Sequence, residues 1–269
     1  SDIPVRFEGR DSYTDGKSIT ISSSIKDKDF DPTVGLALHE GSHILLTDFS
    51  IMEGLVNRYE HINGDTTFKV MEKYGYTADQ ANSYIAGHLK NLLNIIEDRR
   101  IDNFVFKSAP GYKGYYHALY NKYFNSKIID KAFGSTEKRN LDWDSYMFHI
   151  INITNSNRDL SALPGLLDVY KMIDLANISR LKTTSDALTI ATEIYNIVES
   201  NLPKPEVQDT TGGKDGEEDK DCQGENAGCS SPTGTKEAKT PEGQAPEDDG
   251  SKAKGGLAQT LSELSPRQK

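Results

Sequence analysis

The sequence predicts a mainly α-helical domain with a small β element near its N-terminus, followed by a long polar tail. Apolar residues recur at helical spacing over much of residues 1–201, and one short stretch alternates like a β-strand. After Leu202 the tail consists mostly of Gly, Pro, Ser, Thr and charged residues. So little apolar surface cannot offset the entropy of folding. We therefore expect a folded domain over residues 1–201 and a disordered, acidic, low-complexity tail or linker over residues 202–269.

Local signals place the individual elements. The only convincing strand is the β-prone stretch 17–22, which follows the turn signal Asp15-Gly16. Asp31 and Pro32 predict the start of a helix, capped by Asp31, that continues to Leu46. Thr77 and Gln80 have the spacing of a capping box and predict the longest helix, which we expect to reach Val105. Further helices are expected around residues 115–124, 145–153, 163–176 and 185–198.

Composition excludes several classes of function. The chain of 269 residues carries a net charge of −10 and has no Lys/Arg-rich stripe, which argues against binding nucleic acid. It contains no apolar run of 18 residues and no signal-peptide pattern, so we expect no membrane span and a cytoplasmic location. The start at Ser1 and the low-complexity end suggest a fragment of a longer chain. Both cysteines, Cys222 and Cys229, lie in the tail, so a metal in the domain would need His, Asp or Glu ligands.

The segment His39-Glu40-Gly41-Ser42-His43 is the strongest candidate for a functional site. Residues four apart share a helix face, so His39 and His43 can both direct an imidazole nitrogen at one metal ion. Glu40 is then placed to act as the general base on a metal-bound water. The flanking residues are apolar, which predicts a buried helix whose polar residues need a reason to be there. We expect the metal to be Zn²⁺.

A catalytic zinc site has three protein ligands, and the third must come from elsewhere in the chain. Glu97 lies between apolar residues four positions away on either side, so its carboxylate should be buried and in need of a cation. We therefore predict Glu97 as the third ligand. Asp98 and Asp102 form a polar stripe with Asn94, suited to orienting the histidine rings. The alternative for this stripe is simple pairing with the neighbouring arginines on a solvated face.

Three further residues are weaker candidates. Asp48 follows the motif helix and could support a histidine ring, although a residue there is more often only a helix end. Tyr116 and His117 are candidates for stabilising the oxyanion that forms during hydrolysis. Tyr116 also belongs to a stripe with Tyr112, Tyr120 and Tyr123 at helical spacing, which is more typical of a core or groove wall. His61, His88 and His149 have no partner at ligand spacing.

Two stretches together resemble a known family. Residues 35–43, which contain the His-Glu-x-x-His motif, and residues 94–102, Asn-Ile-Ile-Glu-Asp-Arg-Arg-Ile-Asp, are similar to the metallopeptidase-like domain linked to von Willebrand factor A modules in bacteria and their viruses. The resemblance covers roughly residues 15–125. It implies a zincin-like, gluzincin-type peptidase with His39, His43 and Glu97 as zinc ligands and Glu40 as base. It also implies that the acidic tail is a linker to a von Willebrand A domain.

Two functions follow as hypotheses. The first is a zinc peptidase acting on a peptide or protein substrate, in which residues 19–22 form an edge strand that pairs with the extended substrate. The second is a non-catalytic, metal-stabilised binding or assembly module that acts with a von Willebrand A domain or an ATPase. A site with three protein ligands and a water favours the enzyme, whereas four protein ligands favour the module.

Overall fold

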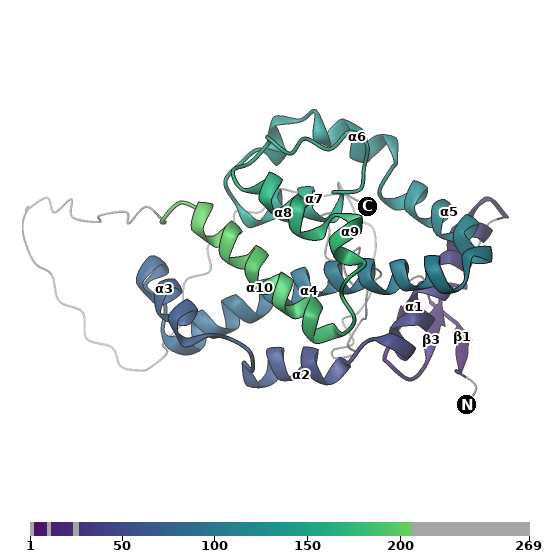
Figure 1. Ribbon diagram of the computed structural model, residues 1–269, viewed down its shortest axis with the longest axis horizontal. Coiled ribbons are helices and arrows are strands. Elements are labelled where there is room, and N and C mark those ends of the chain that lie inside the picture. Colours follow the sequence, from purple (N-terminus) through teal and green to yellow (C-terminus); the bar gives the residue numbers. More distant parts are fainter. Residues whose placement is uncertain (1–2, 10–11, 24–26, 206–269) are drawn as a thin grey trace, which may run out of the picture. The chain divides into compact units, whose positions relative to one another are not determined.

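The computed structural model describes residues 3–9, 12–23 and 27–205, which are mainly helical with a small three-stranded sheet at the N-terminal end (Figure 1). The predicted α-helical class with a minor β element is confirmed. The tail that was predicted to be disordered lies almost wholly within residues 206–269, which are outside the described residues. Cys222 and Cys229 lie in this part of the chain. Among the described residues, no helix combines the length and apolarity needed to cross a membrane.

The sheet consists of β1 (Val5–Phe7), β2 (Tyr13–Thr14) and β3 (Ile19–Ile21) in the order β1-β3-β2. β3 pairs with β1 in parallel and with β2 antiparallel. The strand predicted within residues 17–22 is therefore confirmed as β3. The prediction that it forms an edge strand for substrate is wrong, because β3 is the central strand and both of its sides are already hydrogen-bonded within the sheet.

Ten α-helices follow among the described residues, with short 3₁₀ turns at Asp27–Asp29, Pro110–Tyr112 and Thr136–Lys138. In chain order they are α1 (Phe30–Leu46), α2 (Phe49–Arg58), α3 (Gly64–Tyr74), α4 (Ala78–Ser108), α5 (Lys113–Tyr123), α6 (Lys127–Phe133), α7 (Trp143–Ile151), α8 (Leu166–Ile173), α9 (Leu175–Ile178) and α10 (Thr184–Asn201). The sequence patterns predicted most of these helices, but α2, α3 and α6 were not expected.

A side-chain cap explains where α4 begins, whereas α1 begins without one. The predicted capping box is confirmed, since the Thr77 hydroxyl accepts from the Gln80 N–H and the Gln80 side chain accepts from the Thr77 N–H. α4 then runs to Ser108, slightly beyond the expected end. Asp31, predicted as the cap of α1, lies inside the first turn instead. Asp29 holds the cap position, and its carboxylate pairs with Lys122 of α5 at 3.0 Å.

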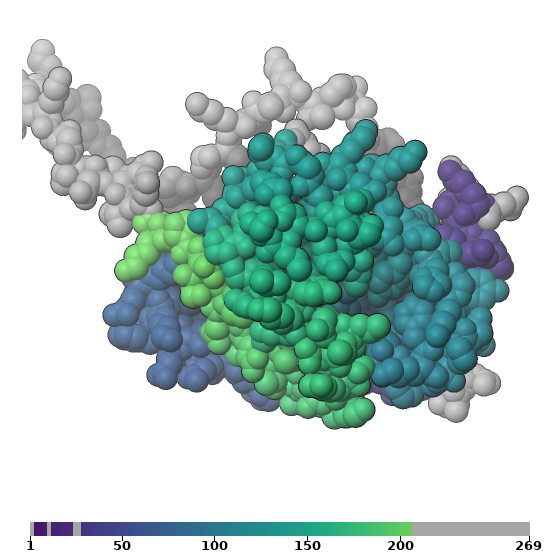
Figure 2. All heavy atoms as spheres, turned by 45° about the horizontal axis from the view of Figure 1, so that its top comes forward, coloured from purple at the N-terminus to yellow at the C-terminus, as the bar shows by residue number. Residues whose placement is uncertain are grey.

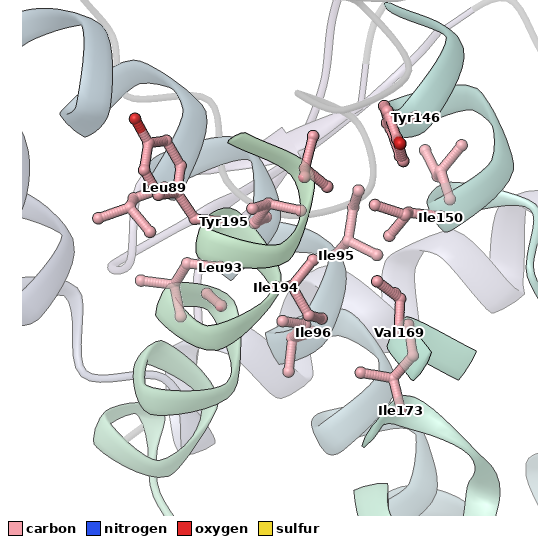
Figure 3. Packing of buried hydrophobic residues seen from close by; sticks show 14 of the residues in the cluster. Leu89, Leu93, Ile95, Ile96, Tyr146, Ile150, Val169, Ile173, Ile194 and Tyr195 are labelled. Carbon is pink, nitrogen blue, oxygen red and sulfur yellow. The ribbon is translucent and has the colours of Figure 1, made fainter. Parts of the chain in front are cut away.

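α4 is the central helix of the core and packs against both α1 and α10. Its buried apolar side chains join those of α7, α8 and α10 in one cluster, and Figure 3 shows these side chains converging. The later helices, green in Figure 2, cover the middle of the face shown there. α4 is therefore buried around most of its circumference over residues 92–102.

Candidate metal centre

α1 and α4 bring three potential metal ligands together. Nε2 of His43 lies 3.3 Å from Nε2 of His39 and 3.1 Å from Oδ1 of Asp98. The third side of this triangle, from Nε2 of His39 to Oδ1 of Asp98, measures 3.6 Å. His39 is fully buried, His43 is 2% exposed and Asp98 is 6% exposed. This buried cluster of His39, His43 and Asp98 could hold a metal ion.

The size of the triangle fits a small divalent ion. In a tetrahedral zinc site with bonds of about 2.0–2.2 Å, ligand atoms lie about 3.3–3.6 Å apart. The three observed separations are 3.1, 3.3 and 3.6 Å. Three such donors occupy one face of a tetrahedron and leave one position open. Two of these separations fall within that range and the third is slightly shorter, so the three donors could hold a divalent metal ion.

The remaining ring nitrogens are held by other side chains. Nδ1 of His39 lies 2.8 Å from Oδ1 of Asp102, and Nδ1 of His43 lies 2.9 Å from the Thr47 hydroxyl. If each Nδ1 carries the proton and donates it, Nε2 presents its lone pair toward Asp98. Asp102 thus occupies the orienting position predicted for it. Thr47, the residue that follows α1, was not predicted, although its hydroxyl and its spacing of four residues from His43 could have indicated it.

Tyr120 extends this chain of contacts. Its hydroxyl donates to Oδ2 of Asp102 at 2.5 Å, so both oxygens of that carboxylate are engaged. Burial, together with the charge of Asp102, raises the pKa of Tyr120 well above its ordinary value. The phenol therefore stays protonated and remains a donor to Asp102. Sequence reasoning placed Tyr120 only in an aromatic stripe; its role depends on the packing of α5 against α1, which the stripe does not reveal.

The electrostatics of the metal-free cluster are those of buried ion pairs. Burial acts to lower the pKa of His39, but the carboxylates of Asp102 and Asp98 outweigh it and raise that pKa well above 6.5. Burial acts to raise the pKa of Asp98, but hydrogen bonds and charge from His39 and His43 lower it to about 2. Without a metal, these pKa directions favour a protonated His39 beside the ionised carboxylates of Asp98 and Asp102. A divalent cation between the same atoms would replace that proton.

Glu97, predicted as the third ligand, is directed elsewhere. Its carboxylate accepts from Nε and Nη2 of Arg100 at 2.8 and 2.6 Å and from the Thr184 hydroxyl at 2.9 Å. Arg100 also donates to the carbonyl of Leu46 at the end of α1. The burial of Glu97 was expected correctly, but the compensating cation is Arg100. The structure therefore replaces Glu97 with Asp98 in the donor cluster, because adjacent helical residues point about 100° apart.

The weaker candidates lie outside the donor cluster. Asp48 caps α2, where its side chain accepts from the Ser50 N–H at 3.0 Å, so the helix-end alternative applies. Tyr116 is buried in the core against Phe106, with ring centroids 5.4 Å apart, and burial raises its pKa. His117 is exposed and lines a neighbouring cavity. An oxyanion-stabilising role for Tyr116 or His117 stays a prediction.

Two glycines let α1 approach its neighbours. A Cβ at Gly35 would lie 2.5 Å from the backbone carbonyl oxygen of Tyr115, so this glycine permits the close contact between α1 and α5. A Cβ at Gly41 would lie 3.3 Å from Cδ1 of Ile19 in β3. Gly41, in the middle of the motif, therefore serves the packing of α1 on the sheet. Glu40 beside it is fully buried.

Comparison with known proteins adds no relative. No family model matches the chain, and neither a curated protein nor a solved structure matches it. The cluster itself is a buried, three-donor site that could hold a metal ion, with Asp102 and Thr47 contacting the Nδ1 atoms of its two histidines.

Proposed function

We propose that this domain is a zinc-dependent hydrolase that cleaves peptide bonds. The observation that carries the proposal is the triangle formed by His39, His43 and Asp98, whose sides of 3.1, 3.3 and 3.6 Å match one face of a tetrahedral zinc site. Two nitrogen donors and one carboxylate oxygen suit zinc, and three protein ligands with an open fourth position are typical of catalytic rather than structural zinc.

The contacts behind the histidines support a working metal site. Asp102 and Thr47 would fix which nitrogen of each ring faces a bound ion, and a carboxylate partner such as Asp102 is typical of metal-bound histidines. Bound zinc would polarise the substrate carbonyl and lower the pKa of a coordinated water toward neutrality. The use of an aspartate as third ligand departs from the gluzincin pattern implied by the resemblance to von Willebrand A-linked peptidases.

Glu40 is the proposed general base. It follows His39 directly on α1 and is fully buried in the same region. Its carboxylate accepts a proton from the attacking water as the C–O bond forms, and then delivers that proton to the amide nitrogen as the C–N bond breaks. The products are one carboxylate and one amine, which accounts for all atoms of the peptide and the water.

The test is a comparison of two isosteric variants. Glu40→Gln should retain zinc and lose at least about 100-fold in the rate of peptide cleavage, since general acid–base catalysis contributes about 10²–10⁴-fold. Glu53→Gln is the matched control, because Glu53 is exposed on α2. Cleavage of denatured casein, followed by mass spectrometry of new termini, reports the activity, and elemental analysis reports the zinc. Equal cleavage by Glu40→Gln and the parent would refute the proposed mechanism.

One observation favours a second candidate, a metal-stabilised binding or assembly module. His39, His43 and Asp98 are at most 6% exposed, which suits a closed structural site as well as a catalytic one. In this case the domain would act with a von Willebrand A domain or an ATPase. Cobalt substitution separates the two functions. A coordination sphere with an exchangeable water supports the hydrolase, and one filled by protein ligands supports the module.

A further inference from the structure

A cavity of about 340 Å³ lies beside the metal centre, lined by residues of α4, α5, α8 and α9. This volume is at the lower end of the range for small-molecule sites. One wall is apolar and includes Phe106, Ile173 and Ile178. Asn121 and Leu175 line the cavity and are exposed, Leu175 to 74%, so the cavity reaches the surface at this side. The cavity thus combines an apolar wall with access from solvent.

Arg99 contributes the positive charge in the cavity wall, which also contains the carboxylate of Asp102. It is the only Lys or Arg among the described residues that line the cavity. Nη2 donates to the backbone carbonyls of Ile150 and Ile151 at 3.3 and 3.0 Å, which fixes the guanidinium. The buried Nε–H has no hydrogen-bond partner among the described residues, and no described carboxylate forms a salt bridge with Arg99. Asp98 and Asp102 act on Arg99 through their charge but form no salt bridge with it, so the guanidinium can still pair with an anion that enters the cavity.

The nearest acid in the wall does not fill this role. Asp102 also lines the cavity, but its two oxygens face Nδ1 of His39 and the Tyr120 hydroxyl. Arg99, Asp102 and Tyr120 also line a small void of about 20 Å³ that borders Asp98. That void has room for about one water molecule. The cavity and the void thus share Arg99, Asp102 and Tyr120 in their walls, and the void borders the proposed zinc ligand Asp98.

We propose that this cavity binds the carboxylate of a small organic acid with an apolar group, and specifically the C-terminal residue of a peptide. The Arg99 guanidinium would pair with the terminal carboxylate, and the apolar wall would hold the side chain. The second part of the proposal rests on the proposed hydrolase function. Under this second part, the substrates are peptides with a free C-terminus. They are cleaved near that end because the cavity lies next to the metal centre.

Binding of a matched probe pair to the zinc-free protein tests the first part without any catalysis. N-acetyl-leucine carries the carboxylate, and N-acetyl-leucinamide has the same shape without the charge. Calorimetric titration should show binding of the acid at least about tenfold tighter than that of the amide, as expected for a charge-assisted hydrogen bond. Equal binding of the two probes, or binding of neither, would overturn the proposal.

Two variants locate the site. Arg99→Gln should remove the preference for the acid. Because Arg99 also anchors Ile150 and Ile151, a second variant avoids the risk of misfolding: Asn121→Asp places a negative charge in the exposed part of the wall without a change of size. It should weaken binding of the acid and leave the amide unchanged. Unchanged binding of the acid in a folded Asn121→Asp protein would place the probe elsewhere and refute the site.

Cleavage of free-acid and amidated forms of one peptide by the zinc-loaded parent tests the second part. Faster cleavage of the free acid supports it, and equal cleavage sinks the substrate assignment while leaving the hydrolase proposal intact. Carboxylate binding in the cavity without cleavage of either peptide would retain the binding site and refute the hydrolase.

Discussion

Replacing Asp98 with Asn should abolish stable zinc binding. Oδ1 of Asp98 completes the donor triangle at 3.1 Å from His43 and 3.6 Å from His39, and a neutral amide is a poor zinc ligand. Loss of a partner that only orients a ligand costs about 10–100-fold in metal affinity, so loss of the ligand itself should cost more than about 100-fold. Asp102→Asn, which changes a partner of His39 and of Tyr120 but none of the three proposed ligands, should fall within the about 10–100-fold range.

Glu97→Gln is the decisive comparison, because sequence reasoning assigned Glu97 to the metal. The structure pairs it with Arg100 at 2.6 Å in a buried site where the side chains are 1% and 5% exposed. Breaking a buried pair costs about 3–5 kcal/mol of folding stability. Glu97→Gln should thus lower the midpoint of urea unfolding and leave zinc affinity within a few-fold of the parent.

Competition with a chromophoric chelator measures the zinc affinity of all three variants, and urea unfolding of the zinc-free proteins measures their stability. If Asp98→Asn binds zinc like the parent and a folded Glu97→Gln does not, the assignment of the third ligand is wrong. If neither variant changes zinc affinity, the assignment of His39, His43 and Asp98 as a metal site is wrong.

Three further predictions concern helix packing, pH and capping. Gly35→Ala should destabilise the domain by about 1–3 kcal/mol through overpacking, while Gly87→Ala, with open space around it, should be neutral or stabilise by up to about 1 kcal/mol; urea unfolding compares them. The raised pKa of His39 means that its contribution to the stability of the metal-free protein is complete below about pH 6.5 and lost as pH rises through the raised pKa. The lowered pKa of Asp98 means that its contribution is complete above about 3.8 and lost as pH falls toward about 2. Thermal unfolding in EDTA across this range should therefore show the parent losing its advantage over His39→Gln at high pH, and a constant difference would contradict the ion-pair account. Thr77→Ala should cost about 1 kcal/mol through loss of the cap of α4, and an unchanged unfolding midpoint would show that packing alone sets this helix start.

Local signals in the sequence were enough to predict much of the fold. The capping box at Thr77, the helix that carries the motif and the strand at residues 19–21 all depend on neighbours within a few residues, and all are present. α2 and α3 were not predicted; they are short helices of 10 and 11 residues whose apolar residues are mostly only partly buried or exposed. Their side-chain caps, Asp48 and Asn63, are the signals that could have revealed them.

The motif on α1 could be predicted for the same reason, since the spacing of His39 and His43 lies within a single helix. Of the contacts around it, the one between Thr47 and His43 is also local, whereas Tyr120 reaches Asp102 only through the packing of α5 in the folded domain. The edge-strand hypothesis failed on a comparable point: β3 has a recognisable strand pattern, but the position of a strand within a sheet depends on segments that pair with it.

The choice between Glu97 and Asp98 shows where reasoning from helix periodicity ends. A surface helix has one buried face, so a carboxylate on that face needs a cation and becomes a candidate metal ligand. α4 has no single buried face near residue 97, because α1 and α10 pack against it from different directions. The burial of Glu97 and Asp98 therefore predicts that each carboxylate needs a positively charged partner. It does not predict which residue or ion that partner is. Arg100, one turn along the helix, compensates Glu97, and the histidines of α1 are left to Asp98.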